Sequence, residues 1–220
     1  FTMSQNWDSR VPIRSDSITT TCINTKEMNT RISKIRAIPQ PEQRTPEWYE
    51  FRHGLITASN LYKVFGSEAL RNSLIYEKCL PLKEDRDCMA IIHVNTTSPM
   101  HWGQKYEPVS VMLYENIYKS KVEDFGCIQH PKYSYIGASP DGIITDPSSE
   151  RYGRMLEIKN IVNRDITVPS KPYWVQMQIQ METCNLDKCD FLETRFKEYD
   201  DEDAFYAEES DKRKGIILYF

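Results

Sequence analysis

The chain of 220 residues is predicted to form a mixed α/β domain, in which a β-sheet packs against helices. Three observations support this fold class. Segments with apolar residues at helical spacing occupy residues 45–80 and follow Gly103. Short strand-like segments separated by Pro, Gly and Ser lie between residues 122 and 161, and a further amphipathic segment with two strand-like segments comes after them. Because 40% of the residues are hydrophobic, the chain can bury the core of one large domain.

Residues 1–36 are rich in Ser, Thr and Asn and show little periodicity. We therefore predict a loosely ordered N-terminal arm that precedes a single domain over residues 37–220. The chain begins with Phe1 rather than methionine, and its last residues have a strand pattern. Since a domain seldom stops in the middle of a sheet, we expect the native chain to continue beyond residue 220.

The segment "TPEWYEFRHG" predicts the first helix. Thr45 is a suitable N-cap, and Pro46 fits the first helical position because its missing N–H needs no partner there. Apolar residues at 48, 51 and 55 then share one face. The tryptophans at 48, 102 and 174 are expected to anchor the core rather than to stack on a ligand.

A second helix is predicted with Thr57 or Ser59 as its cap and with Gly66 at its end. A third helix is predicted over residues 69–80, and a polar connection over residues 81–99.

A long helix is predicted after Gly103, with Glu107 beside an inner apolar stripe formed by Tyr106, Val109, Leu113 and Ile117. Strands are predicted next over residues 122–129, 133–138, 142–145 and 154–161. Their spacing predicts a meander that closes a sheet.

The segment "KPYWVQMQIQMETCNL", residues 171–186, predicts another amphipathic helix. Strands are predicted over 190–196 and 215–220, on either side of an acidic insertion at about residues 197–212. Residues 193–211 contain nine acids and two bases, a net charge of −7, which leaves +3 for the rest of a chain with net charge −4. A mildly basic body is compatible with a phosphate-bearing ligand, and the insertion is expected to be a solvated loop.

The six cysteines are scattered, and we expect free thiols, because a chain of this size needs no disulfide framework. An iron–sulfur cluster would need four thiolates at close, regular spacing, which the sequence lacks. The four histidines lack zinc-ligand spacing. No run approaches the roughly 18 apolar residues of a membrane span, and no signal-peptide pattern is present, so we expect a soluble intracellular protein.

The segment "GASPDG" followed by "MLEIK" combines two acids and a lysine. The period of two in a strand directs Glu157 and Lys159 to the same face, and Asp141 meets them if it ends a neighbouring strand. Two close carboxylates repel each other, and a divalent cation relieves that repulsion. Mg²⁺ binds one or two carboxylates together with waters and a substrate phosphate, which predicts metal-assisted phosphodiester hydrolysis. Glu-x-Lys alone is more often a solvated strand face, so spacing by itself does not decide between the two interpretations.

Four segments in order carry a resemblance to a known family: "EWYEFRHGLITAS", "HWGQKYE", "GASPDG" with "LEIK", and "YWVQMQIQM". Together they resemble the lambda exonuclease and YqaJ viral recombinase family of restriction-endonuclease-like PD-(D/E)xK nucleases, over roughly residues 45–220. The resemblance implies a central mixed β-sheet flanked by α-helices. It also implies digestion of double-stranded DNA from an end, 5′ to 3′, with Mg²⁺ or Mn²⁺.

Site residues follow from the matched motifs. The resemblance implies that Asp141 and Glu157 bind the metal with the backbone carbonyl of Ile158, and that Lys159 is the catalytic lysine. Glu107 matches an additional metal-site acid, and Gln176 a supporting glutamine. Arg52 and Ser59 match positions that bind the terminal 5′-phosphate, for which a helix start with free N–H groups is suited. Arg164 matches a further phosphate contact. The alternatives without a functional role are a surface acid for Glu107, an ion pair for Arg52, a helix cap for Ser59 and a solvated amide for Gln176.

Two other functions remain open at this point. One is a single-strand or structure-specific RecB-like nuclease, and the other is a catalytically weak DNA-binding recombination scaffold. The resemblance also implies a homo-oligomer, a single-strand annealing or helicase partner and, for a viral member, a place in the host cytoplasm or a viral factory.

Overall fold

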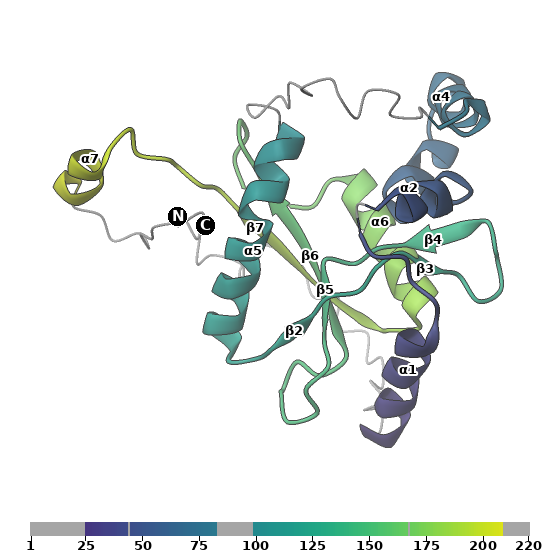
Figure 1. Cartoon of the computed structure of the whole chain (residues 1–220), viewed down its shortest axis with the longest axis horizontal. Helices are drawn as coiled ribbons and strands as arrows, with labels where there is room; N and C mark the ends of the chain where they lie inside the picture. The colour runs from purple at the N-terminus through teal and green to yellow at the C-terminus, as the bar shows by residue number, and fades with distance from the viewer. Residues whose placement is uncertain (1–24, 44, 83–98, 167, 209–220) are drawn as a thin grey trace.

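The computed structural model describes residues 25–43, 45–82, 99–166 and 168–208, and it has two small sheets set between helices (Figure 1). The larger sheet has the strand order β2-β5-β6-β7, formed by Val122–Glu123, Gly142–Ile144, Arg154–Asn160 and Lys188–Thr194. β2, β5 and β6 pair antiparallel, whereas β6 and β7 are parallel and are joined through helix α6 (Lys171–Cys184). The predicted mixed α/β fold is therefore confirmed.

The smaller sheet has the order β1-β4-β3, formed by Ile56–Thr57, Ile136–Ala138 and Ile128–Gln129. The predicted meander is wrong, because the chain leaves the larger sheet after β2 and returns to it only at β5. The predicted strand 122–129 is accordingly two strands in different sheets. Two side chains from the loop between α1 and α2 bind the backbone between β2 and β3. Gln40 accepts from the N–H of Gly126 at 2.8 Å, and Gln43 donates to the carbonyl of Phe125 at 3.1 Å.

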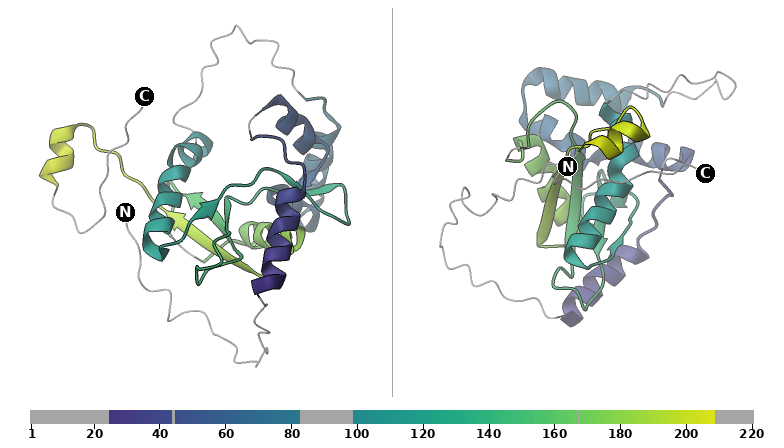
Figure 2. Two further views of the ribbon diagram at one scale, coloured as in Figure 1. Left: turned by 60° about the horizontal axis from the view of Figure 1, so that its bottom comes forward. Right: turned by 90° about the vertical axis from the view of Figure 1, so that its left-hand side faces the viewer.

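Helices cover both faces of the larger sheet, with α5 (Pro99–Tyr118) on one side and α6 on the other (Figures 1 and 2). On the α5 side, Tyr114, Ile144, Leu156 and Ile158 form one buried cluster. On the opposite side, Ile143 and Met155 belong to a second cluster with Ile128 and Cys184. Strands β5 and β6 thus contribute alternate residues to two cores, as the period of two requires.

Helix α1 (Thr25–Ala37) belongs to that second cluster through Met28, Ile32 and Ile35, which are all buried. The prediction of a loosely ordered arm is therefore wrong for residues 25–36, and the rest of that prediction lies outside the described residues. The three apolar residues occupy successive turns of one helix face, and burial of that face against the sheet stabilises a segment of otherwise polar composition.

The N-terminal helices begin where their caps predict. Helix α2 (Pro46–His53) has Thr45 as N-cap, whose side chain accepts from the N–H of Trp48 at 3.3 Å. Helix α3 (Ala58–Leu61) follows Thr57 and continues as a 3-10 turn, η1 (Tyr62–Phe65), up to Gly66. Helix α4 (Glu68–Cys79) matches the predicted third helix.

Helix α5 begins at Pro99, five residues before its predicted start after Gly103, so that Gly103 lies inside its first turns. Its buried face carries Tyr106, Ser110, Leu113 and Tyr114.

Two further differences from the prediction concern the exposure of Trp174 and the structure of the acidic insertion. Trp174 is 56% exposed and is no core anchor. The acidic insertion contains helix α7 (Glu202–Ala207), which begins where the side chain of Asp201 accepts from the N–H of Ala204 at 2.7 Å and lies away from the sheets in Figure 1.

The described cysteines, Cys79, Cys127, Cys184 and Cys189, are free thiols. Burial raises the pKa of the Cys184 thiol to about 12, which keeps it protonated and unreactive. Among the helices that the structure describes, none has the length and apolar composition needed to cross a membrane. The predicted strand 215–220 lies outside the described residues.

Candidate active site

Strand β6 carries the centre of the site. Its residues alternate between the two faces of the sheet, so that Leu156, Ile158 and Asn160 face α5. Glu157 and Lys159 project from the other face, and the Lys159 ammonium donates to Oε1 of Glu157. The predicted convergence of this acid and this base is thus present in the structure.

Asp141 lies at the start of β5, beside the middle of β6. Its backbone N–H donates to the carbonyl of Leu156 at 3.1 Å, and its Oδ2 accepts from the N–H of Ile158 at 2.6 Å. Gly142 makes this close approach of strands feasible, since a Cβ at that position would overlap the side chain of Val122 on β2. The Asp-Gly pair therefore serves the packing of the sheet as well as the site.

Glu157 is completely buried, and three donors surround its carboxylate. Besides Lys159, the amide of Gln176 donates to Oε1 at 2.7 Å, and the amide of Gln180 donates to Oε2 at 2.8 Å. Gln176 and Gln180 lie one turn apart on α6, which brings both amides to the same carboxylate. Hydrogen bonds of this kind offset the cost of burying a charged group.

The charges of the site influence one another strongly. Burial and then the neighbouring Glu157 raise the pKa of Asp141 well above its ordinary value, and Glu107 adds to the effect. Burial opposes the charged form of Lys159, but the carboxylates of Glu157 and Asp141 outweigh it and raise the pKa of Lys159. Two carboxylates in one buried place attract a cation, and the lysine supplies only a single positive charge.

A small cavity of about 220 Å³ opens beside these groups, and predicted residues from widely separated parts of the chain line it together. Asp141, Glu157, Lys159, Glu107 and Gln176 lie on its wall, and so do Arg52 and Ser59. The structure thus places seven of the nine predicted site residues on one cavity.

Arg52 comes from α2, and its guanidinium lies 4.3 Å from the centre of the Trp48 ring. Its Nη1 donates to Oγ of Ser139 at 2.9 Å, which orients it toward the segment before Asp141. Ser59 lies in α3, one residue after the first helical position, and its hydroxyl is 3.2 Å from that of Thr57. A guanidinium and two hydroxyls on one wall are suited to bind a phosphate.

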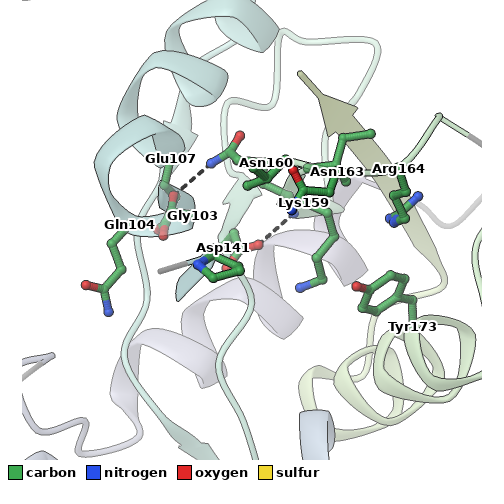
Figure 3. A pocket seen from close by; sticks show the side chains of 13 residues that line it. Gly103, Gln104, Glu107, Asp141, Lys159, Asn160, Asn163, Arg164 and Tyr173 are labelled. Carbon is green, nitrogen blue, oxygen red and sulfur yellow. Dashed lines mark hydrogen bonds between the residues drawn. The ribbon is translucent and has the colours of Figure 1, made fainter. Parts of the chain in front are cut away.

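A second, larger cavity of about 530 Å³ shares Gln104, Glu107, Asp141 and Lys159 with the first. In Figure 3, Gln104 and Glu107 on α5 form one side, and Tyr173 and Arg164 form the other. Ile158 and Arg164, the two remaining predicted residues, line this cavity. The Arg164 guanidinium pairs with the nearly buried Glu193, and Arg164 lines the larger cavity, whereas Arg52 and Ser59 line the small one.

Asn160 ties α5 to the end of β6. Its amide donates to the carbonyl of Gly103 at 2.8 Å, and its Oδ1 accepts from Ser110 and Thr194, each at 2.6 Å. Because Glu107 lies one helical turn after Gly103 on α5, this network fixes the position of Glu107 along the helix axis relative to Lys159.

A divalent cation fits this donor set. In the described part of the chain no three His, Cys, Asp or Glu side chains converge closely enough to enclose a metal on their own. Mg²⁺ does not need such a cage, because it is held by one or two carboxylates with waters and substrate oxygens. Asp141 and Glu157 provide hard oxygen ligands. Burial first and then the charge of Glu157 raise the pKa of Asp141, and a cation beside the two carboxylates would favour their charged forms.

Three residues that were not predicted from the sequence also lie at the site. Gln180 repeats Gln176 at a helical spacing of four, a pattern that was visible in the sequence. Ser139 and Asn160 are neighbours of Asp141 and Lys159 in the chain, but only the fold shows what they bind.

The fold and the arrangement of the site are similar to those of a solved exonuclease. The crystal structure of the alkaline exonuclease LHK-Exo from Laribacter hongkongensis superposes with a TM-score of 0.55 and 28% identity, covering 69% of this chain and 74% of that one. The structure of LHK-Exo in complex with dAMP gives a TM-score of 0.52 and 26% identity, covering 68% and 73%. The YqaJ-like viral recombinase domain model matches residues 47–187, and the chain belongs to this family.

A curated relative comes from Acanthamoeba polyphaga mimivirus, where it bears the name uncharacterized protein R354. It is 30% identical over 206 residues, which cover 86% of this chain. The match covers 35% of the relative, so the chain spans about a third of its length.

Proposed function

We propose that this chain is a metal-dependent exonuclease that hydrolyses double-stranded DNA from an end in the 5′ to 3′ direction. Its family and its similarity to LHK-Exo support exonuclease chemistry. The LHK-Exo complex contains dAMP, a DNA nucleotide, which supports DNA as the substrate.

One observation carries the proposal: the small cavity joins a carboxylate–lysine centre to a cationic and hydroxyl-bearing wall. The centre consists of Asp141, Glu157 and Lys159, and the wall contains Arg52 and Ser59. A chain end whose terminal phosphate lies at the wall presents its next phosphodiester to the centre. The larger cavity, on the other side of Asp141 and Lys159, then receives the rest of the strand.

Asp141 and Glu157 would hold Mg²⁺ or Mn²⁺, with the carbonyl of Ile158 as a further ligand and Glu107 as an acid for a second ion or its water. Such an ion polarises the phosphodiester and lowers the pKa of a bound water. Phosphodiesters are very inert, and the residues around the reacting phosphate must supply charge and position. Lys159, which Glu157 holds in place, stabilises negative charge that develops at phosphorus.

Arg52 and Ser59 hold the terminal 5′-phosphate, and their place beside Asp141 accounts for cleavage that begins at a 5′ end. Arg164 contacts a phosphate farther along the strand, in the larger cavity that it lines. Its pairing with Glu193 orients the guanidinium for that contact. A homo-oligomer and a strand-annealing or helicase partner remain predictions from the family resemblance.

Digestion of end-labelled DNA tests the proposal. We expect Mg²⁺ or Mn²⁺ to release a 5′ label from a blunt, 5′-phosphorylated linear duplex before a 3′ label, and EDTA to stop the reaction. A closed circular duplex should remain intact. Faster digestion of single strands would favour the RecB-like alternative, cutting of the circle would identify an endonuclease, and binding without cleavage would favour a recombination scaffold.

A further inference from the structure

Gln180 lies at the junction of the two halves of the small cavity. It is completely buried on α6, and its Nε2 donates to two acceptors: Oε2 of Glu157 at 2.8 Å and the backbone carbonyl of Ser139 at 3.1 Å. The amide group has two N–H donors, so each acceptor receives one of them. One side chain thus binds the central carboxylate and the segment that leads to Asp141.

The orientation of this amide follows from its neighbours. Both contacted atoms are acceptors only, and a flipped amide would set its oxygen against the Glu157 carboxylate and the Ser139 carbonyl. The oxygen Oε1 is therefore fixed on the remaining side of the group. It is buried, and no described residue donates a hydrogen bond to it. A buried amide oxygen without a donor costs free energy, and a residue that only filled the core would avoid this cost.

The contact to Ser139 extends to the proposed phosphate-binding wall. Ser139 accepts from the Arg52 guanidinium through its hydroxyl while its carbonyl accepts from Gln180. Pro140, which is buried, and then Asp141 follow directly in the chain. Displacement of Gln180 would therefore remove the donor to Oε2 of Glu157 and the contact to the Ser139 carbonyl together, while Lys159 and Gln176 still bind Oε1 of Glu157.

We propose that Gln180 is a positioning residue that fixes Glu157 relative to the Ser139–Asp141 segment, and so sets the geometry in which both carboxylates bind a divalent cation. The inference rests on the proposed function. Gln180 is distinct from Gln176 in this role, because Gln176 donates to Glu157 alone among the contacts described for it. The Oε1 atom accepts a hydrogen bond from a water of the loaded site, a contact that satisfies its buried oxygen.

The test measures Mn²⁺ binding by the whole chain without DNA, by isothermal titration calorimetry. Gln180→Met removes both donors and the acceptor at nearly equal volume. Gln178→Met is the matched control, since Gln178 lies on the same helix and is exposed. Loss of a residue that orients a metal ligand weakens metal binding by about 10- to 100-fold. We expect a loss of that size for Gln180→Met, an affinity within about threefold of wild type for Gln178→Met, and melting temperatures of the two variants in EDTA that agree within a few degrees.

A second readout follows the Ser139 link. The preference of digestion for 5′-phosphorylated over 5′-hydroxyl ends should decrease in Gln180→Met and persist in Gln178→Met. If Gln180→Met does not fold, Gln180→Glu replaces it. Glutamate has the shape of glutamine, but a carboxylate oxygen would then face the two acceptors, Oε2 of Glu157 and the carbonyl of Ser139. Loss of folding in both variants would assign Gln180 to folding alone and overturn the inference.

Equal Mn²⁺ affinity in Gln180→Met and Gln178→Met would also overturn the inference, while an active wild-type chain would leave the proposed function intact. Absence of Mn²⁺ binding and of DNA digestion in the wild-type chain would instead overturn the proposed function, and this inference with it. The two failures are therefore distinguishable.

Discussion

The backbone N–H of Ile158 donates a 2.6 Å hydrogen bond to the carboxylate of Asp141. This bond fixes Asp141 between Glu157 and Lys159, the two residues that flank Ile158 in β6. A carboxylate at the start of β5 is thereby held beside the centre of β6, and the consequences for stability and chemistry can be measured separately.

Asp141→Asn should stabilise the metal-free chain and abolish metal-dependent cleavage. Burial and Glu157 raise the pKa of Asp141 in the folded state, so the folded chain holds a proton that the unfolded chain releases from about its ordinary pKa of 3.8. The stability of the wild type therefore falls as pH rises from that value through the folded pKa. The asparagine still accepts from Ile158 and carries no charge.

Melting temperatures in EDTA across this pH range check the prediction, with about 2–4 °C expected per kcal/mol of stabilisation. The difference between variant and wild type should be near zero in acid and largest at neutral pH. Asp146→Asn is the control of opposite sign, because hydrogen bonds from Ser148 lower the pKa of Asp146. An Asp141→Asn variant that is less stable than wild type at neutral pH would contradict the conclusion that folding raises the pKa of Asp141.

Lys159→Met should separate catalysis from metal binding. The variant keeps the aliphatic stem and removes the charge that lies against Glu157. Loss of one stabilising donor in an active site lowers kcat by about 10²–10³. Mn²⁺ affinity should be at least as high as in wild type, since a positive charge beside the carboxylates is gone. Lys121→Met, at a position with a largely exposed side chain, should change neither quantity. Retention of kcat in Lys159→Met would exclude a catalytic lysine.

Arg52→Lys should weaken the preference for 5′-phosphorylated ends. Lysine keeps the charge but loses the planar fork and the bond to Ser139. A hydrogen bond to a charged group contributes about 1.5–3 kcal/mol, so the ratio of kcat/KM for phosphorylated and hydroxyl ends should fall by about tenfold or more. Arg71→Lys on α4, where the guanidinium donates to the carbonyl of Gly66, is the control. An unchanged ratio would remove Arg52 from the end-binding wall.

Asn160→Ala should destabilise the chain by about 1–3 kcal/mol, because the buried hydroxyls of Ser110 and Thr194 lose their shared acceptor and keep only each other. The Gly103 carbonyl also loses the Asn160 donor. Urea denaturation checks this value, with Asn116→Ala as the exposed control. Since the same network holds the first turns of α5, kcat should fall in the remaining folded protein. A destabilised variant with full kcat would show that Glu107 needs no such support.

Ile32→Ala should cost about 2–5 kcal/mol, as expected for a buried side chain in a packed core. Ser33→Ala, one residue further on the exposed side of α1, should be nearly neutral. Urea denaturation of both variants tests whether α1 is part of the domain. Equal stability of the two would restore the interpretation of this segment as an unpacked arm.

The sequence predicted the centre of the site because its geometry is local. The alternation of β6 alone places Glu157 and Lys159 on one face, and the Pro-Asp-Gly turn places Asp141 at a strand start. Gln180 was missed although its helical spacing of four from Gln176 is visible in the sequence. Asn160 was not predicted, because its partner Gly103 is 57 residues away in the chain, a separation that no short-range pattern encodes.

The fold was predicted least well where tertiary contacts decide it. Helix α1 depends on only three apolar residues, so composition favoured disorder, whereas burial against β3, β5 and β6 favours the helix. The break between β2 and β3 depends on Gln40 and Gln43, side chains from a distant loop that bind its backbone. The intrinsic helix or strand preference of a segment includes neither the burial of α1 nor these two hydrogen bonds.

Strand β6 has hydrophobic clusters on both of its sides and also carries Glu157 and Lys159. Neither half of the core can therefore open on its own without pulling apart the groups proposed to cut DNA. Heat should consequently abolish the proposed cleavage at the same temperature at which the chain melts, with no partly folded form that still digests DNA.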